Sequence, residues 1–261
     1  ADAGLSFRRQ DRTLFARCRE LPIDVTFLRT DDIGVLCEEG AIDLGITGSD
    51  LLAERTVDLD VRLKLGVGRC RLALCVPDTS TAASAKDLAG QSVATSFPKL
   101  TETYFEEHGV KTHLVNLSGS VEVMVALGVA QAVVDLVETG STLAANRLRI
   151  FDDIGHFETV LVQNHARRHA ELADRVVRRL EGVVIARSYS LLEYNVPRAQ
   201  LKDAEAITPG YHSPTVSALE DETWCAVKVM VKRGEVLDVM ERLEAVGATA
   251  ILETSIANCR L

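Results

Sequence analysis

The order of apolar and polar positions changes near residue 187, and this change predicts two kinds of domain. Before it, short apolar runs alternate with polar turns and helical patterns, which is typical of α/β lobes. After it, the pattern predicts strands at 189–196, 216–219, 223–231 and 249–256, with helices after Pro197 and over 235–246. This βαββαβ order indicates a ferredoxin-like module.

The first 186 residues predict two α/β lobes. Strands are expected at 23–29, 41–46, 72–76, 92–95, 112–117 and 158–163, and helices at 30–39, 96–109 and 165–180. The segment 77–81 is rich in turn residues, so we expect a hinge there, with the strand at 158–163 returning to the first lobe. Two lobes joined by two crossings are the layout of periplasmic binding proteins.

The segment 132–143 carries the strongest chemical signal. Val133, Val134, Leu136 and Val137 form a run typical of a strand covered on both faces, and Gly140 with neighbouring hydroxyl residues breaks it before a helix begins. Backbone N–H groups at such a turn form an anion site that suits a phosphate. Asp135 and Glu138 stand beside it, and carboxylates bind ribose hydroxyls or Mg²⁺. An ordinary turn capped by Thr or Ser is the alternative.

Composition narrows the class of protein. The 261 residues are 47% hydrophobic with a net charge of −9, which disfavours general nucleic-acid binding. No apolar run approaches the roughly 18 residues that span a membrane, and no signal peptide is visible, so we expect a cytoplasmic enzyme. The six cysteines form no CxxC pair and are most simply small buried hydrophobes rather than zinc ligands. Walker A, Ser-His-Asp and HExxH patterns are not found.

Several motifs together resemble one family in the same order along the chain. They are Gly45-Ile46-Thr47-Gly48 with Asp50, Leu65 to Leu72, the Ala-Thr-Ser-x-Pro-x-Leu-Thr pattern at 94–101, the loop at 138–142 and the Ile-Thr-Pro-Gly segment from 207. This combination resembles the long form of the ATP phosphoribosyltransferases, which open histidine biosynthesis. The resemblance implies a two-lobe catalytic region like that of periplasmic binding proteins and a ferredoxin-like regulatory domain. The implied bounds are 1–76 with 157–186 for lobe I, 77–156 for lobe II and 187–261 for the regulatory domain.

The resemblance also implies a reaction and the residues that serve it. N1 of ATP would attack C1 of phosphoribosyl pyrophosphate, giving phosphoribosyl-ATP and pyrophosphate. Asp135 and Glu138 are the expected catalytic residues, and Mg²⁺, carried by the substrate, is the expected cofactor. Phosphoribosyl pyrophosphate would be bound by Asp135, at its ribose hydroxyls, and by Thr139, Gly140, Ser141 and Thr142, at its 5-phosphate. ATP or pyrophosphate would be bound by Arg69, Arg71, Glu122, Gly48 and Asp50. The alternative for Arg69 and Arg71 is that they are solvated residues on an edge strand. The alternative for Glu122 is that its carboxylate caps a helix.

For the C-terminal module, the resemblance implies feedback inhibition by L-histidine and a homo-oligomer, from dimer to hexamer. The effector residues would be Asn195, Tyr211, Thr215 and Ala250. Asn195 stands where some relatives carry Asp, and Tyr211 replaces the usual Leu. The family's first strand and its Pro-x-Lys-Gly-Arg-like loop have no counterpart in this sequence, which opens Ala1-Asp2-Ala3-Gly4 without an initiator methionine.

Two other functions fit parts of the pattern. A two-lobe solute-binding protein shares the expected layout of the first 186 residues, although the C-terminal module argues against it. A non-catalytic, histidine-sensing subunit fits a chain without the basic loop, although the phosphate loop argues against that function.

Overall fold

The structure is a computed structural model that describes residues 2–7, 14–138 and 140–261. It divides into two compact units. The larger unit comprises residues 27–173, and the smaller comprises residues 1–26 with 174–261. Among the described residues, no helix combines the length and the apolar character needed to cross a membrane.

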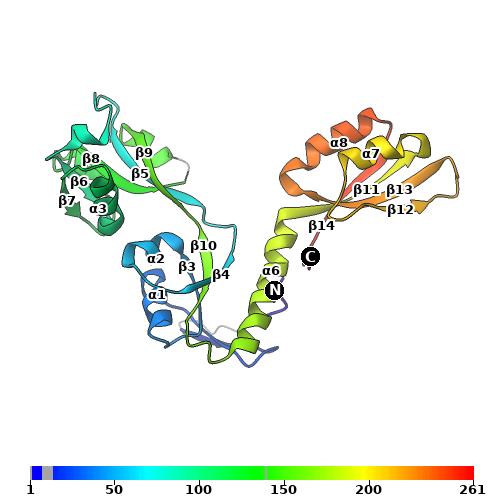
Figure 1. Ribbon diagram of the computed structural model, residues 1–261, viewed down its shortest axis with the longest axis horizontal. Helices are drawn as coiled ribbons and strands as arrows, with labels where there is room; N and C mark the ends of the chain where they lie inside the picture. Colours follow the sequence, from blue (N-terminus) through cyan, green and yellow to red (C-terminus); the bar gives the residue numbers. More distant parts are fainter. Residues whose placement is uncertain (1, 8–13, 139) are drawn as a thin grey trace. The chain divides into compact units, whose positions relative to one another are not determined.

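The larger unit contains two α/β lobes, each built on its own sheet (Figure 1). The first lobe has the strand order β3-β10-β4, with both neighbours antiparallel to the central β10. Its core gathers Cys37 of α1, Leu52 of α2, and Val160 and Val162 of β10. The elements of this lobe are α1 (Thr30–Glu38), β3 (Leu44–Gly48), α2 (Ser49–Arg55), β4 (Asp60–Lys64) and β10 (Thr159–Gln163).

The second lobe has the strand order β7-β6-β8-β5-β9. β6 is parallel to β7 and β8, whereas β5 is antiparallel to β8 and β9. One face of the sheet packs against α3, and the other face packs against α4 and α5. Its elements are β5 (Cys70–Pro77), the 3-10 helix Ala85–Leu88, β6 (Ser92–Thr95), α3 (Pro98–Glu107), β7 (His113–Asn116), α4 (Val123–Ala126), β8 (Ala132–Val137), α5 (Ser141–Ala145) and β9 (Leu148–Phe157).

The crossings between the lobes differ from the expected hinge. All of β5 lies in the second lobe's sheet, paired with β8 and β9, so the first crossing lies at 65–69 and not at 77–81. Leu65 N donates to Thr159 O and Thr159 N donates to Val67 O, both at 3.0 Å, so the two crossing segments bind each other. The buried apolar run of β5 was correctly predicted to be a strand, but a run alone does not say which sheet it joins.

The smaller unit contains the predicted ferredoxin-like module. The strand order is β12-β13-β11-β14, all antiparallel, and α7 and α8 cover one face of the sheet (Figure 1). The elements are β11 (Tyr189–Pro197), the 3-10 helix Arg198–Gln200, α7 (Leu201–Ile207), β12 (Thr215–Ala218), β13 (Trp224–Lys232), the 3-10 helix Arg233–Glu235, α8 (Val236–Ala245) and β14 (Thr249–Ser255). The predicted βαββαβ order is confirmed.

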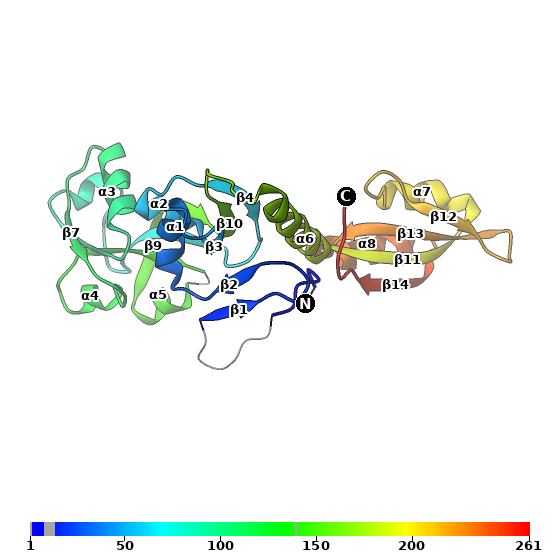
Figure 2. The same cartoon turned by 90° about the horizontal axis from the view of Figure 1, so that it is seen from below.

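The N-terminal segment and the last residues of the chain lie beside α6 (Ala170–Ser188), as Figure 2 shows. Arg179 Nη1 donates to Gly4 O at 2.7 Å, and Cys259 N donates to Gly182 O at 2.9 Å. A short hairpin of β1 (Phe15–Arg17) and β2 (Asp24–Thr26) belongs to the same unit. The chain divides into two compact units, whereas the prediction concerns three domains. The bounds of those three domains therefore stay a prediction.

Candidate active site

The predicted phosphate loop lies at the end of a central, fully covered strand. β8 sits between β5 and β6, and its residues 132–134 are completely buried. Gly140 follows with φ of +79°, a left-handed conformation that favours glycine, and α5 begins at the next residue. Ser141 and Thr142 are exposed in the first turn of α5, whereas Thr139 lies outside the described residues. The turn therefore presents hydroxyl groups at the carboxyl end of the strand.

Asp135 is the acidic residue held within the sheet behind this turn. Its Oδ1 accepts a 2.8 Å hydrogen bond from Leu136 N. Burial raises the pKa of Asp135; the hydrogen bond opposes this effect, and the nearby charge of Glu122 adds to it. Glu122 precedes α4 on the same side of the sheet, so two of the predicted site carboxylates lie near each other.

The two predicted arginines occupy different surroundings. Arg71 is on β5 opposite Val137, and its Nη1 lies 3.3 Å from Asp153 Oδ2 on β9. Arg69 is exposed in the crossing segment that precedes β5. Arg71 is thus a cation already paired inside the second lobe, on the strand next to β8.

The first lobe contributes Gly48 and Asp50 at the start of α2. Asp50 is 7% exposed, and a Cβ at Gly48 would lie 2.1 Å from Asp50 Oδ1, so a side chain at 48 would displace that carboxylate. Burial, then the charges of Asp50 and Glu138, raise the pKa of Cys70. Cys70 therefore lies within reach of the charges of a first-lobe carboxylate and of the first residue of the loop at 138–142.

Asp153 and His156 of β9 belong to this neighbourhood, although no sequence pattern predicted them. Asp153 lies opposite Ala73 and contacts Arg71, and His156 Nε2 lies 4.0 Å from Asp153 Oδ2. The only sequence signal was a pair of aspartates within a stretch of mixed apolar and polar residues, which does not distinguish a site from a surface.

The predicted effector residues separate into two places within the smaller unit. Asn195 on β11 lies opposite Thr249, next to Ala250, which has φ of +49° at a bulge in the β11–β14 pairing. Thr215 opens β12, opposite Lys228 of β13. These residues belong to one sheet, with Asn195 and Ala250 on neighbouring strands.

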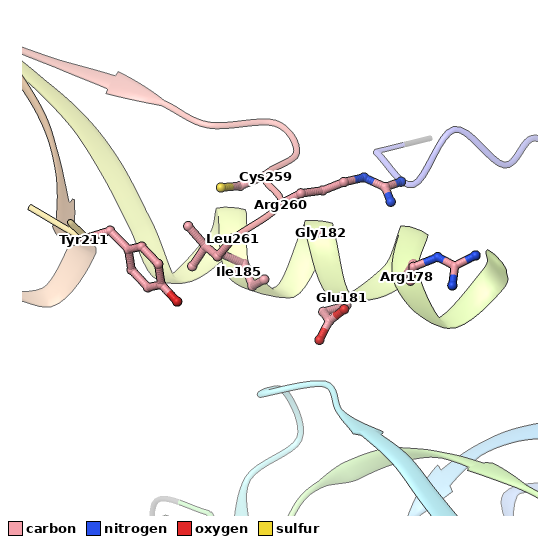
Figure 3. A pocket seen from close by; sticks show the side chains of 8 residues that line it. All are labelled: Arg178, Glu181, Gly182, Ile185, Tyr211, Cys259, Arg260 and Leu261. Carbon is pink, nitrogen blue, oxygen red and sulfur yellow. The ribbon is translucent and has the colours of Figure 1, made fainter. Parts of the chain in front are cut away.

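Tyr211 lies elsewhere, in a pocket of about 430 Å³ between α6 and the end of the chain (Figure 3). Arg178, Glu181 and Ile185 line it from α6, and Cys259 to Leu261 line it from the C-terminal tail. The other proposed effector residues, Asn195, Thr215 and Ala250, are not among the residues that line this pocket.

Among the described residues, no group of three or more His, Cys, Asp or Glu side chains is placed to hold a metal ion.

The fold and site together define a two-lobe α/β protein with a phosphate-type turn between acidic residues and a ferredoxin-like module at its C-terminal end. Comparison with known families agrees: the family described as ATP phosphoribosyltransferase matches residues 29–182, and the one described as HisG, C-terminal domain, matches residues 186–258. The chain belongs to the ATP phosphoribosyltransferase family, in the long form that carries this C-terminal domain.

Individual relatives support this membership. An ATP phosphoribosyltransferase of Rhodopirellula baltica is 63% identical over 259 residues, covering 99% of this chain and 87% of the relative. One from Saccharopolyspora erythraea is 40% identical and covers 100% of this chain and 93% of the relative. A solved ATP phosphoribosyl transferase (HisG:HisZ) complex from Thermotoga maritima superposes with a TM-score of 0.62 at 26% identity, over 70% of this chain and 88% of that one.

Proposed function

We propose that this chain transfers the phosphoribosyl group of phosphoribosyl pyrophosphate to N1 of ATP, the first step of histidine biosynthesis. The observation that carries the proposal is the Gly140 turn at the end of β8, with Asp135 behind it and with Asp50 of the other lobe and Glu138 both near enough to Cys70 to raise its pKa. Family membership supports the reaction, and this arrangement supports a sugar-phosphate site between acidic groups.

In the proposed complex, the 5-phosphate binds the turn of Gly140, Ser141 and Thr142, together with Thr139. Asp135 and Glu138 hold the ribose hydroxyls, either directly or through Mg²⁺. Arg69 and Arg71 serve the phosphates of ATP or of the leaving pyrophosphate. Gly48, Asp50 and Glu122 are proposed to serve ATP or the leaving pyrophosphate.

The reaction asks for little covalent chemistry from the protein. The adenine N1 lone pair forms the new bond to C1 of the ribose while the C1–O bond to pyrophosphate breaks, and its electron pair leaves with the pyrophosphate. Positive charge develops on the sugar, so the fixed carboxylates of Asp135 and Glu138 stabilise the transition state. Holding the two substrates in line supplies much of the rate, and N1 needs no general base.

Mg²⁺ is the proposed cofactor, and it would reach the site with the substrate. Bound there, it would neutralise the charge of the leaving pyrophosphate. The chain's own contribution is one or two carboxylate oxygens, of which Asp135 and Glu138 are the candidates, since Mg²⁺ retains water and phosphate ligands in such sites.

The ferredoxin-like module is proposed to bind L-histidine and to inhibit the transferase, within a homo-oligomer between dimer and hexamer in size. Asn195, Thr215 and Ala250 are the proposed contacts, and Asn195 with Ala250 form the pair that a small ligand can reach together. Tyr211 is a proposed fourth contact, although it lies in the pocket beside α6.

Release of pyrophosphate tests this function against its two rivals. The protein is incubated with Mg²⁺ and with ATP, phosphoribosyl pyrophosphate or both. Release that requires both substrates supports the transferase. Binding of phosphoribosyl pyrophosphate without release favours a non-catalytic histidine-sensing subunit. Binding of neither substrate, with capture of another small solute, favours a solute-binding protein.

A further inference from the structure

The Thr-Ser-x-Pro-x-Leu-Thr part of the 94–101 motif builds the turn between β6 and α3. Thr95 and Thr101 are completely buried, and their hydroxyl oxygens lie 3.0 Å apart. Thr95 Oγ1 accepts from Phe97 N at 2.9 Å, and Thr101 Oγ1 donates to Phe97 O at 2.6 Å. These contacts fix the first turn of α3 within the second lobe, but none of them satisfies the N–H groups of Lys99 and Leu100.

Those two N–H groups bind a side chain of the first lobe. Lys99 N donates to Glu54 Oε1 at 2.8 Å, and Leu100 N donates to Glu54 Oε2 at 3.0 Å. The N-cap residue Phe97 makes no side-chain cap, so Glu54 takes the place that a local Ser, Thr or Asp usually fills. A carboxylate at a helix N-terminus also gains from the helix dipole. Figure 1 shows α2 and α3 as neighbours across the two lobes.

The helix that carries Glu54, α2, also carries Asp50 near its N-terminal end. α2 spans only Ser49–Arg55, with Asp50 in its first turn, and Leu51 packs against the core of the second lobe. Asp50 is the first-lobe carboxylate that acts on Cys70 together with Glu138. Anchoring α2 at Glu54 therefore fixes how far Asp50 stands from the phosphate loop.

We propose that Glu54 is a positioning residue of the transferase. Its carboxylate, bound to the first turn of α3, sets the spacing between the first-lobe side of the active site and the loop after β8. The proposal rests on the proposed function, because it gives Asp50 and the loop a shared substrate. It assigns Glu54 no contact with that substrate.

The test compares Glu54→Ala and Glu54→Gln with a matched control. Glu102→Gln removes one negative charge from α3 itself, where Glu102 is exposed and pairs only with Lys99 among the interactions described. Hydrogen exchange of the Lys99 and Leu100 amides reports the cap directly, and steady-state kinetics with each substrate varied reports the positioning. Circular dichroism and the melting temperature report that each variant is folded.

For Glu54→Ala we expect exchange at both amides to accelerate by about tenfold or more, because local opening then exposes them. We expect kcat/KM to fall by about 10- to 100-fold, mostly through kcat, since misplacement of about 1 Å costs on that order. Glu54→Gln keeps the length and one acceptor oxygen, so it should protect one amide and lose less activity. Glu102→Gln should match the parent in both measurements.

Two results would overturn the proposal. Unchanged protection of both amides in folded Glu54→Ala would show that Glu54 does not cap α3. Faster exchange with the parent's kcat and KM values would show that the contact exists but positions nothing. A parent protein without turnover would instead refute the proposed function, while the exchange data would still report on the cap.

Discussion

Asp135 on β8 and Asp153 on β9 lie opposite the same residue, Ala73 of the intervening strand β5. Side chains on one face of a sheet two strands apart are separated by about 10 Å, enough for a ribose ring between them. Asp153 is paired with Arg71, whereas the carboxylate of Asp135 accepts only a hydrogen bond from the backbone among the contacts described. The two aspartates therefore differ in their surroundings: Asp153 is paired with a cation, whereas Asp135 has no cationic partner among the contacts described.

Replacing Asp135 by Asn should separate activity from stability. We expect kcat/KM to fall by about 100-fold, because a fixed charge at the developing cation is lost. The folded-state pKa of Asp135 is raised by burial. An acid with a raised pKa favours folding at low pH, and this contribution is lost as pH rises above the ordinary value of about 3.9. Near neutral pH the neutral Asn should therefore leave the melting temperature unchanged or raise it. A large loss of stability would contradict this interpretation of the site.

Thiol labelling should report the approach of the two lobes at Cys70. Burial raises the pKa of Cys37 to about 11 and that of Cys75 to about 12, so both thiols should resist an alkylating reagent near neutral pH. Cys70 is half-buried, and we expect bound phosphoribosyl pyrophosphate to block its labelling. When the substrate occupies about 90% of the sites, about one tenth of the molecules stay reactive, so labelling should slow by about tenfold. Mass spectrometry of the labelled peptides measures this change, with Cys259 as the control. Equal labelling of Cys70 with and without substrate would place the substrate elsewhere.

The proposed histidine contacts predict different effects on inhibition for Asn195, on the sheet, and for Tyr211, in the pocket beside α6. Asn195→Ala should weaken inhibition by histidine about tenfold, as expected for loss of one hydrogen bond to a charged ligand, and should leave kcat unchanged. Tyr211→Leu restores the usual family residue and should change the inhibition constant less, because Tyr211 lies beside α6. Inhibition curves for both variants provide the measurement. A larger effect at Tyr211 than at Asn195 would move the effector site to the pocket beside α6.

The attachment of the C-terminal tail to α6 predicts a stability change at Gly182. A Cβ there would lie 2.8 Å from Cys259 O and 2.5 Å from Asn258 Oδ1, so Gly182→Ala must displace the tail. Such overpacking typically costs about 1–3 kcal/mol. Thermal unfolding should show the loss, while Gly234→Ala, where a Cβ meets nothing within 4 Å, should be neutral. Equal melting temperatures for the two variants would mean that the tail does not pack there.

The sequence predicted best where a single pattern decides the structure. The helix expected at 235–246 is α8, Val236–Ala245, and the strand expected at 189–196 is β11, Tyr189–Pro197. Apolar residues recur with the 3.6-residue period of a helix in α8, and buried residues alternate with the two-residue period of a strand in β11. The helix expected at 165–180 instead runs from Ala170 to Ser188, because its arginine-rich pattern gives no sharp start or stop. The strand β9 was not predicted at all, since Asp152, Asp153 and Gly155 interrupt its alternation and its pairing with β5 holds it in place.

The site was predictable only in part. The turn at Gly140 follows from local chemistry, because a positive φ at a strand-to-helix turn favours glycine. The roles given to the predicted site residues stay predictions. Asp153 and Glu54 were beyond sequence reasoning, since their partners lie 82 residues away at Arg71 and 45 residues away at Lys99. Contacts across sheets and lobes depend on topology, which local patterns do not specify.

The most direct test of the central claim is the absorbance near the adenine band after mixing the protein with ATP, phosphoribosyl pyrophosphate and Mg²⁺, with and without histidine. We predict a rise in absorbance that requires both substrates and that histidine suppresses. A rise that ignores histidine would retain the transferase and refute the regulatory role of residues 187–261. No rise, with both substrates intact, would contradict the proposed function.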